Sequence, residues 1–167
     1  MSWEKRVEDI MESLPSSEVQ PDSQLRTVLN IISEAEGKGN CNPTVLVREG
    51  DLILGTVSSS DILNALQPRY TKGRMKMEIF WEGLLTEQWH KIACRAVKDV
   101  MKSPVTVDMN DTLMKASHKM TKHNASMVLV ADSNRIVGVV SLNGLFRELN
   151  SIKCESQASV MASAGSM

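Results

Sequence analysis

A short polar run that follows an apolar stretch is the segment of this sequence best suited to hold a ligand. It reads Gly55-Thr-Val-Ser58-Ser-Ser60-Asp61 and leads from a predicted strand into a predicted helix. The first turn of a helix offers unpaired backbone N–H groups and the positive end of the helix dipole, which together favour a phosphate. The hydroxyls of Ser58 and Ser60 can donate to phosphate oxygens, and the carboxylate of Asp61 can accept both hydroxyls of a ribose. These residue types predict a nucleotide site, although the same letters also make a good helix N-cap.

Other residue types that carry chemistry do not form a recognisable catalytic or metal site. His118 and His123 are five residues apart on a predicted helix, which is neither the i+3 nor the i+4 spacing that would let them share a metal ion. No serine, cysteine or carboxylate can be paired with a base at corresponding strand ends. We therefore expect a protein that is not an enzyme and that has no catalytic residue and no metal site.

Composition and charge narrow the class of protein further. The chain has 167 residues, of which 42% are apolar and 23% charged, as in ordinary globular proteins. Nineteen basic and twenty acidic residues leave a formal charge of −1, which disfavours a nucleic-acid binder. No apolar run reaches the roughly 18 residues that span a bilayer. Because the three cysteines are widely spaced and no apolar leader follows Met1, we expect a cytoplasmic protein without membrane contact.

An internal repeat organises the chain. Val7-Glu-Asp-Ile-Met11 reappears 90 residues later as Val97-Lys-Asp-Val-Met101. Each copy continues with an extended stretch, an amphipathic helix, two β-rich runs and a short closing helix. The first copy is longer only in its loops, while the two β-rich runs keep the same spacing in both copies. This pattern predicts a true structural repeat.

Two repeated units of this size must share a core. A unit of about 60 residues buries too little surface to be stable alone. We therefore predict an α+β fold in which two βαββα units pack sheet to sheet with pseudo-two-fold symmetry. The expected divisions are a first unit at 1–66, a linker at 67–96, a second unit at 97–150 and a flexible tail at 151–167.

The linker has a composition of its own. Its first part, Gln67–Arg74, is a basic loop, which we interpret as solvated rather than as a nucleic-acid patch. Its second part predicts a helix over Met77–Ala96, inserted between the units. Apolar residues spread around much of the circumference of that helix, which is more than one covered face needs; they are Phe80, Trp81, Leu84, Leu85 and Trp89.

The two units resemble cystathionine-β-synthase (CBS) domains, and the tandem resembles a Bateman module. The resemblance is carried by the two opening motifs, by Ser103-Pro-Val-Thr-Val107, and by the Gly55–Asp61 run with its echo Gly138-Val-Val-Ser141-Leu-Asn-Gly144. It covers about residues 5–66 and 95–150. It implies a regulatory module that binds an adenosine-type ligand (AMP, ADP, ATP or S-adenosylmethionine), commonly forms a homodimer, and signals to an effector protein.

The resemblance also implies a second wall for the nucleotide site. In such pairs, a ligand held by the acidic residue of one copy takes its base contacts partly from the first strand of the other copy. Matched position by position, the expected cofactor-binding set consists of Ser58, Ser60 and Asp61 from the first copy and of seven residues from the second copy. Those residues are Ser103, Pro104, Val105, Asp108, Ala125, Ser126 and Met127.

The second cleft of the pair, which is centred on the second copy's helix start, departs from the family pattern. Two interpretations of the protein's function therefore remain. The family's ribose acid falls on Gly144, which has no side chain, although Asn143 could offer an amide. We therefore expect one competent cleft at Asp61 and one weak or empty cleft. Ser126 and Pro43 stand where the family often has Arg or His, which favours AMP or an S-adenosylmethionine-like ligand over a triphosphate. The alternative is a ligand-free dimerisation scaffold that uses the predicted linker helix as its contact surface.

Overall fold

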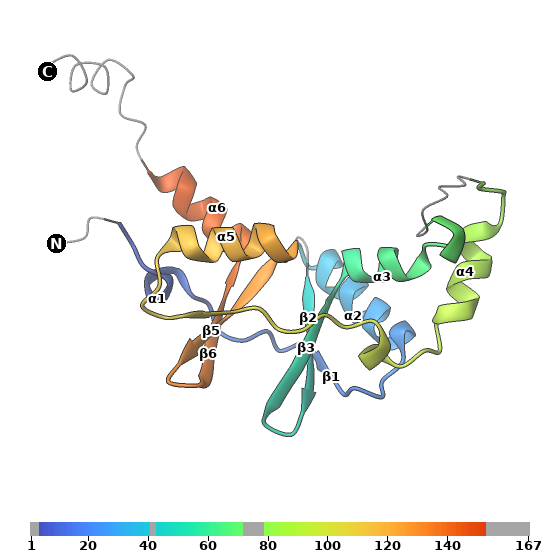
Figure 1. Ribbon diagram of the computed structural model, residues 1–167, viewed down its shortest axis with the longest axis horizontal. Helices are drawn as coiled ribbons and strands as arrows, with labels where there is room; N and C mark the ends of the chain where they lie inside the picture. Colours follow the sequence, from blue (N-terminus) through green and yellow to red (C-terminus); the bar gives the residue numbers. More distant parts are fainter. Residues whose placement is uncertain (1–3, 41–42, 72–78, 153–167) are drawn as a thin grey trace, which may run out of the picture.

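Two small sheets form the centre of the molecule. The structure is a computed structural model that describes residues 4–40, 43–71 and 79–152. The first sheet has the order β1-β2-β3, with β1 (Glu18–Val19) parallel to β2 (Thr44–Glu49) and β3 (Leu52–Ser58) antiparallel to β2. The second sheet repeats this order with β4 (Thr106–Asp108), β5 (Met127–Asp132) and β6 (Arg135–Ser141). Figure 1 shows the two hairpins side by side, with both tips at the lower edge of the view.

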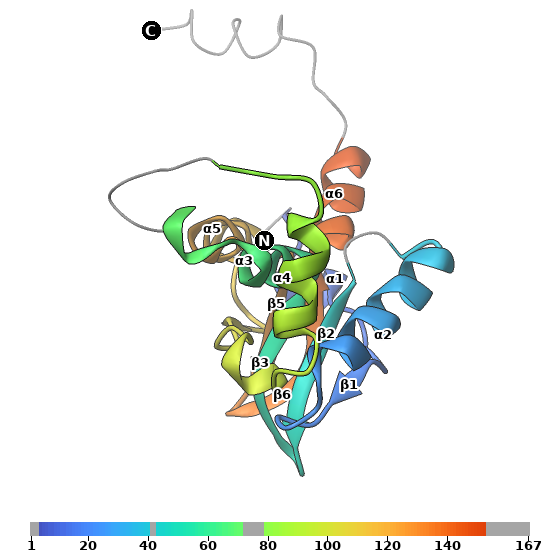
Figure 2. The ribbon, with the colours of Figure 1, turned by 90° about the vertical axis from the view of Figure 1, so that its right-hand side faces the viewer.

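Helices flank the strands in the order that the repeat predicted. The first copy contributes α1 (Val7–Ile10), α2 (Leu25–Gly37) and α3 (Ser59–Leu66), and the second contributes the 3-10 turn η2 (Val97–Asp99), α5 (Leu113–His123) and α6 (Leu142–Ser151). Between the copies lie the 3-10 turn η1 (Arg69–Thr71) and α4 (Leu84–Ile92). Figure 2 shows α2 and α6 on one side of the strands and α3 and α5 on the other. The predicted α+β fold with a doubled unit is confirmed.

Equivalent strands share their irregularities as well as their order. A β-bulge lies between Val47 and Arg48 in the first hairpin and between Val130 and Ala131 in the second. Each sheet has one core against its own helices, and a third cluster of buried Leu46, Leu129 and Val139 lies between the sheets. The predicted sheet-to-sheet packing is therefore present, and it is aliphatic.

The opening motif of each copy packs on the other copy. Val7 is fully buried in the core of the second unit, and Val97 is fully buried in the core of the first. Behind α1, Glu12 exchanges two backbone hydrogen bonds with Val139 of β6, at 2.7 and 2.9 Å. Behind η2, Lys102 does the same with Thr56 of β3, at 3.0 Å each. Figure 1 accordingly shows α1 beside α5 and α6 rather than beside α2.

These crossings explain a glycine in each repeat. A Cβ atom on Gly55 would lie 2.6 Å from the carbonyl oxygen of Lys102, and one on Gly138 would lie 2.6 Å from that of Glu12. Both separations are well inside van der Waals contact, and both oxygens belong to backbone held by hydrogen bonds. We call the opening motif together with the residue that follows it (7–12 in the first copy, 97–102 in the second) the exchanged segment. Only glycine lets the exchanged segment approach the strand so closely.

The linker helix is shorter than the sequence predicted. It covers Leu84–Ile92 rather than Met77–Ala96, so Phe80 and Trp81 precede it; Met77 and Glu78 lie outside the described residues. Gly83, at φ +89°, adopts a left-handed conformation that starts the helix one residue later. At the other end, the carbonyls of Ala93 and Arg95 accept hydrogen bonds from the first N–H groups of α2 instead of continuing the helix.

Asp111 links the turn before α5 to the first turn of that helix. We expect its contribution to the free energy of unfolding to depend on pH. Partial burial alone raises the pKa of Asp111, but hydrogen bonds from the Lys115 ammonium and the Asp108 N–H, both at 2.9 Å, outweigh it and hold the pKa below its ordinary 3.8. A carboxyl whose folded pKa is depressed stabilises the fold above its unfolded pKa and loses this effect as pH falls through its folded pKa. Urea unfolding of Asp111→Asn should therefore show a loss of stability at about pH 7 that shrinks toward about pH 2. An equal loss at every pH would contradict this role for the charge.

Candidate ligand-binding site

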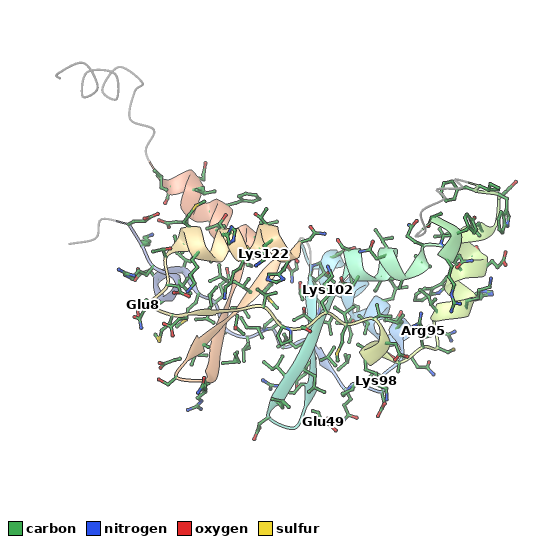
Figure 3. The ribbon with its side chains drawn as sticks, in the orientation of Figure 1. Glu8, Glu49, Arg95, Lys98, Lys102 and Lys122 are labelled. Atoms are coloured by element: carbon green, nitrogen blue, oxygen red, sulfur yellow. The ribbon has the colours of Figure 1, made fainter. Side chains whose placement is uncertain are left out.

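Asp61 lies buried at the start of α3, with only 5% of its surface exposed. One carboxylate oxygen accepts hydrogen bonds from the backbone N–H and the hydroxyl of Ser58, at 2.8 and 3.0 Å. The other oxygen lies 3.0 Å from the ammonium nitrogen of Lys102, an ion pair without hydrogen-bond alignment. Lys102 reaches this position from the exchanged segment, between the two halves of the molecule (Figure 3). Both oxygens of the predicted ribose acid therefore have partners within the protein.

The other predicted residues of that site are distributed over separate places. Ser60 and Ser103 are exposed, and Val105 packs against the core of the second unit. Pro104 lines a cavity at the hairpin tips, and Asp108 accepts a hydrogen bond from the N–H of Asn110 in its own turn. Ala125, Ser126 and Met127 are half-buried where β5 begins.

Ser126 and Met127 line a cavity of about 430 Å³ between the two units. It lies in the opposite cleft, around Ser141 and Asn143, for which the sequence predicted the weaker site. Both copies contribute to its wall. The first copy supplies Glu12, Ser13, Pro15, Ser17, Asn40, Pro43 and Thr44, and the second supplies Ser126, Met127, Val139, Ser141, Leu142, Asn143 and Arg147.

Strand ends and a helix start present the hydroxyls of this cleft. Ser141 ends β6 and caps α6, since its hydroxyl accepts a hydrogen bond from the N–H of Gly144 at 3.0 Å. Thr44 begins β2, Ser126 directly precedes the equivalent strand β5, and their hydroxyl oxygens are 3.2 Å apart. The cavity therefore combines hydroxyl donors from both copies with the N-terminal turn of a ten-residue helix.

Glu12 brings a carboxylate to the place where the second copy lacks its acid. A Cβ atom on Gly144 would lie 3.1 Å from the Oε1 atom of Glu12. The same carboxylate forms an ion pair with Arg147 of α6. The side chains of Glu12 and Arg147 are 42% and 73% exposed, so this pair is weakly held in comparison with the buried Asp61.

The two clefts thus carry ion pairs of opposite polarity. Glu12 and Lys102 follow the opening motifs 90 residues apart and are equivalent in the repeat. One cleft pairs a basic exchanged segment with an acidic helix, and the other pairs an acidic segment with a basic helix. The residue types in the sequence did not identify Glu12, Lys102 and Arg147 as residues of the clefts. The aligned pairs Met11-Glu12 and Met101-Lys102 were the signal that could have found the first two.

The described residues form neither a metal site nor a membrane-spanning helix. No group of three or more metal-ligating side chains was found in the part of the chain that the structure covers. Among the described helices, none has the length and apolar character needed to cross a membrane.

Known proteins share this architecture. Residues 97–151 match the family model of the CBS domain. A solved CBS domain-containing protein from Thermotoga maritima superposes with a TM-score of 0.67 over 92% of this chain and 100% of that chain, at 18% identity. The protein has the fold of a CBS domain pair. A search of curated proteins finds no match to the chain.

Two further solved structures resemble this chain and contain ligands. One is the CBS domain pair of protein MJ0100 in complex with 5′-methylthioadenosine and S-adenosyl-L-methionine, with 20% identity over 89% of this chain and 98% of that chain and a TM-score of 0.61. The other is CBSX2 in complex with AMP, with 18% identity over 89% and 98% of the two chains and a TM-score of 0.61. At these identities the similarity establishes the fold alone.

Proposed function

We propose that this CBS pair is a non-catalytic regulatory module that binds an adenosine-type ligand between its two units and signals to a partner protein. The observation that carries the proposal is the cavity of about 430 Å³ walled by both copies. Structures with the same fold hold AMP in one case, and 5′-methylthioadenosine and S-adenosylmethionine in another. A ligand that contacts both units can favour one relative tilt of the two, which is a change that a partner could read.

The proposed position of the ligand is the cleft at Glu12 rather than the cleft at Asp61. In the Glu12 cleft, the exposed carboxylate can accept ribose hydroxyls, and Ser141 and the start of α6 can hold a phosphate. Glu12 and Arg147 add no net charge, which favours AMP or S-adenosylmethionine over ADP or ATP. The predicted set around Asp61 is the other location for the same ligand, and it requires Lys102 to leave the carboxylate.

Thermal unfolding with AMP, ADP, ATP, 5′-methylthioadenosine and S-adenosylmethionine tests this proposal. A ligand at 100 times its Kd should add about 2.7 kcal/mol of apparent stability. Glu12→Gln keeps the backbone pairing but removes the charge, and should weaken binding about tenfold or more. Asp61→Asn, a matched change in the other cleft, should leave the ligand shift unchanged. The reverse pattern would place the ligand at Asp61, and no shift with any compound would reject the proposal.

A ligand-free dimerisation scaffold is the second candidate, because one surface of the linker is apolar and open. Leu63 of α3 lines a groove of about 280 Å³ together with Phe80, Trp81 and Leu85, and these four side chains are 49–70% exposed. Contiguous apolar surface of this kind is typical of protein contacts. Sedimentation of the ligand-free chain measures the association, and Leu85→Glu should weaken a homodimer formed there.

A further inference from the structure

A second large cavity lies at the other end of the contact between the sheets. Its volume is about 690 Å³, and it lies between the hairpin tips, where β2 ends and β3 and β6 begin. No residue of its wall also lines the Glu12 cleft. Ile53, Leu129 and Ile136 of its wall belong to the cluster packed between the sheets. The cavity is therefore separate from the Glu12 cleft, and of the residues predicted around Asp61 it contains only Pro104.

The repeat does not fill this space symmetrically. Arg48 and Ala131 are equivalent, since each follows the β-bulge of its hairpin and pairs with Ile53 or Ile136. One copy therefore places a guanidinium where the other has only a methyl group. A second cation enters at a position that is not equivalent, because Arg135 begins β6 where β3 begins with leucine. Two arginines thus line one cavity from different hairpins.

Arg48 has a buried donor without an acceptor. Its Nη1 atom lies 3.2 Å from a carboxylate oxygen of Glu18, which anchors one side of the guanidinium. Its Nε atom is buried and has no hydrogen-bond partner among the described residues. An unsatisfied buried N–H is costly. Because the Nε atom is closed to solvent, the guanidinium must turn slightly for the cavity to supply its acceptor. The Nε–H and the neighbouring Nη2 group form a planar fork that matches a carboxylate.

We propose that this cavity binds the carboxylate of a small acid with an apolar body. Arg48 would hold the carboxylate through its fork, and Arg135 would add a second positive charge. Thr106 and Asn134 supply further polar groups, and the inter-sheet isoleucines receive the hydrocarbon part. Asp51 in the wall and Glu18, which pairs with Arg48, balance the charges of the two arginines, so the fork of Arg48 rather than a net positive charge would select a carboxylate. This inference does not depend on the adenosine proposal.

Arginine-selective NMR of the full chain, titrated with benzoate, tests the proposal. The Nε–H signal of Arg48 should shift and saturate, with a Kd on the order of 1 mM. Arg48→Met should raise that Kd about tenfold or more. Arg95→Met is the matched control, because Arg95 is exposed on the far side of the first unit from β5 and β6 (Figure 3), and it should leave the Kd unchanged.

A second Arg48 variant and two inorganic anions complete the test of this cavity. Arg48→Lys keeps the charge but removes the fork, so it should also weaken benzoate binding, and it serves if Arg48→Met does not fold. Chloride and inorganic phosphate at matched ionic strength should not reproduce the saturating shift. The proposal is overturned if benzoate gives no saturable shift, if both Arg48 variants bind it as the unaltered chain does, or if phosphate binds more tightly.

Discussion

Replacing Gly55 or Gly138 with alanine is expected to lower the free energy of unfolding by about 2–3 kcal/mol. Each new methyl carbon would lie 2.6 Å from a backbone carbonyl oxygen of the exchanged segment, Lys102 or Glu12. That segment cannot simply move away, because it exchanges two backbone hydrogen bonds with the neighbouring strand residue. Relief of the clash would separate the segment from the strand and loosen the contact between the two units.

Gly37→Ala is the matched control for this prediction. Gly37 ends α2, and an added Cβ atom would meet no other atom within 4 Å. Alanine there should be neutral or should stabilise by up to about 1 kcal/mol, since it restricts the unfolded chain. Urea unfolding of the three variants gives the comparison. Equal stability of Gly55→Ala and Gly37→Ala would mean that the exchanged segment does not cross β3 as closely as described.

The repeat made the fold predictable from sequence. Matching motifs such as Val7–Met11 and Val97–Met101 aligned the copies, and the β-rich runs kept their spacing, so the order of strands and helices followed from local patterns. The need for two small units to share a core then gave the sheet-to-sheet packing, which Leu46 and Leu129 now form. These predictions depend on periodicity and on surface area, both of which a sequence contains.

Exchange of the opening motifs was not predictable by the same means. Val7 and Val97 have the same burial in the structure, and they would be apolar whichever unit they entered. The choice between units depends on the path of the chain and on close crossings at Gly55 and Gly138. Local patterns also missed the start of α4, because apolar residues continue through Gly83 while its left-handed backbone does not.

The candidate site was only partly predictable, for a physical reason. Residue types identified Asp61 as the acid at a helix start, but its burial and its pairing with Lys102 depend on the exchanged segment. Gly144 was interpreted as a missing ligand group. In three dimensions the same glycine leaves room, and Glu12 brings a carboxylate from the other copy. Residue types therefore indicated which side chains line a cleft, whereas the partners of each acid depend on contacts between the two copies.

Removing the ammonium group of Lys102 should affect stability and ligand binding differently. Lys102→Met leaves the carboxylate of Asp61 buried with one oxygen unpaired, which should cost about 1–3 kcal/mol of unfolding free energy. Asp61→Asn with Lys102→Met restores neutrality, so the double variant should lose about 1 kcal/mol less than the two single losses added together. Lys98→Met is the control: its partner Asp22 is 83% exposed, and no measurable change is expected.

Ligand binding by the same Lys102→Met variant separates the two clefts. If the ribose occupied the Asp61 cleft, the ammonium of Lys102 would compete with it, and removing that group should raise affinity about tenfold or more. Because the Glu12 cleft is walled by other residues, a ligand there should bind Lys102→Met with unchanged affinity. We expect the second result for AMP and S-adenosylmethionine in titration calorimetry. A gain in affinity would show that the carboxylate of Asp61, once released from its ion pair, is the group that holds the ligand.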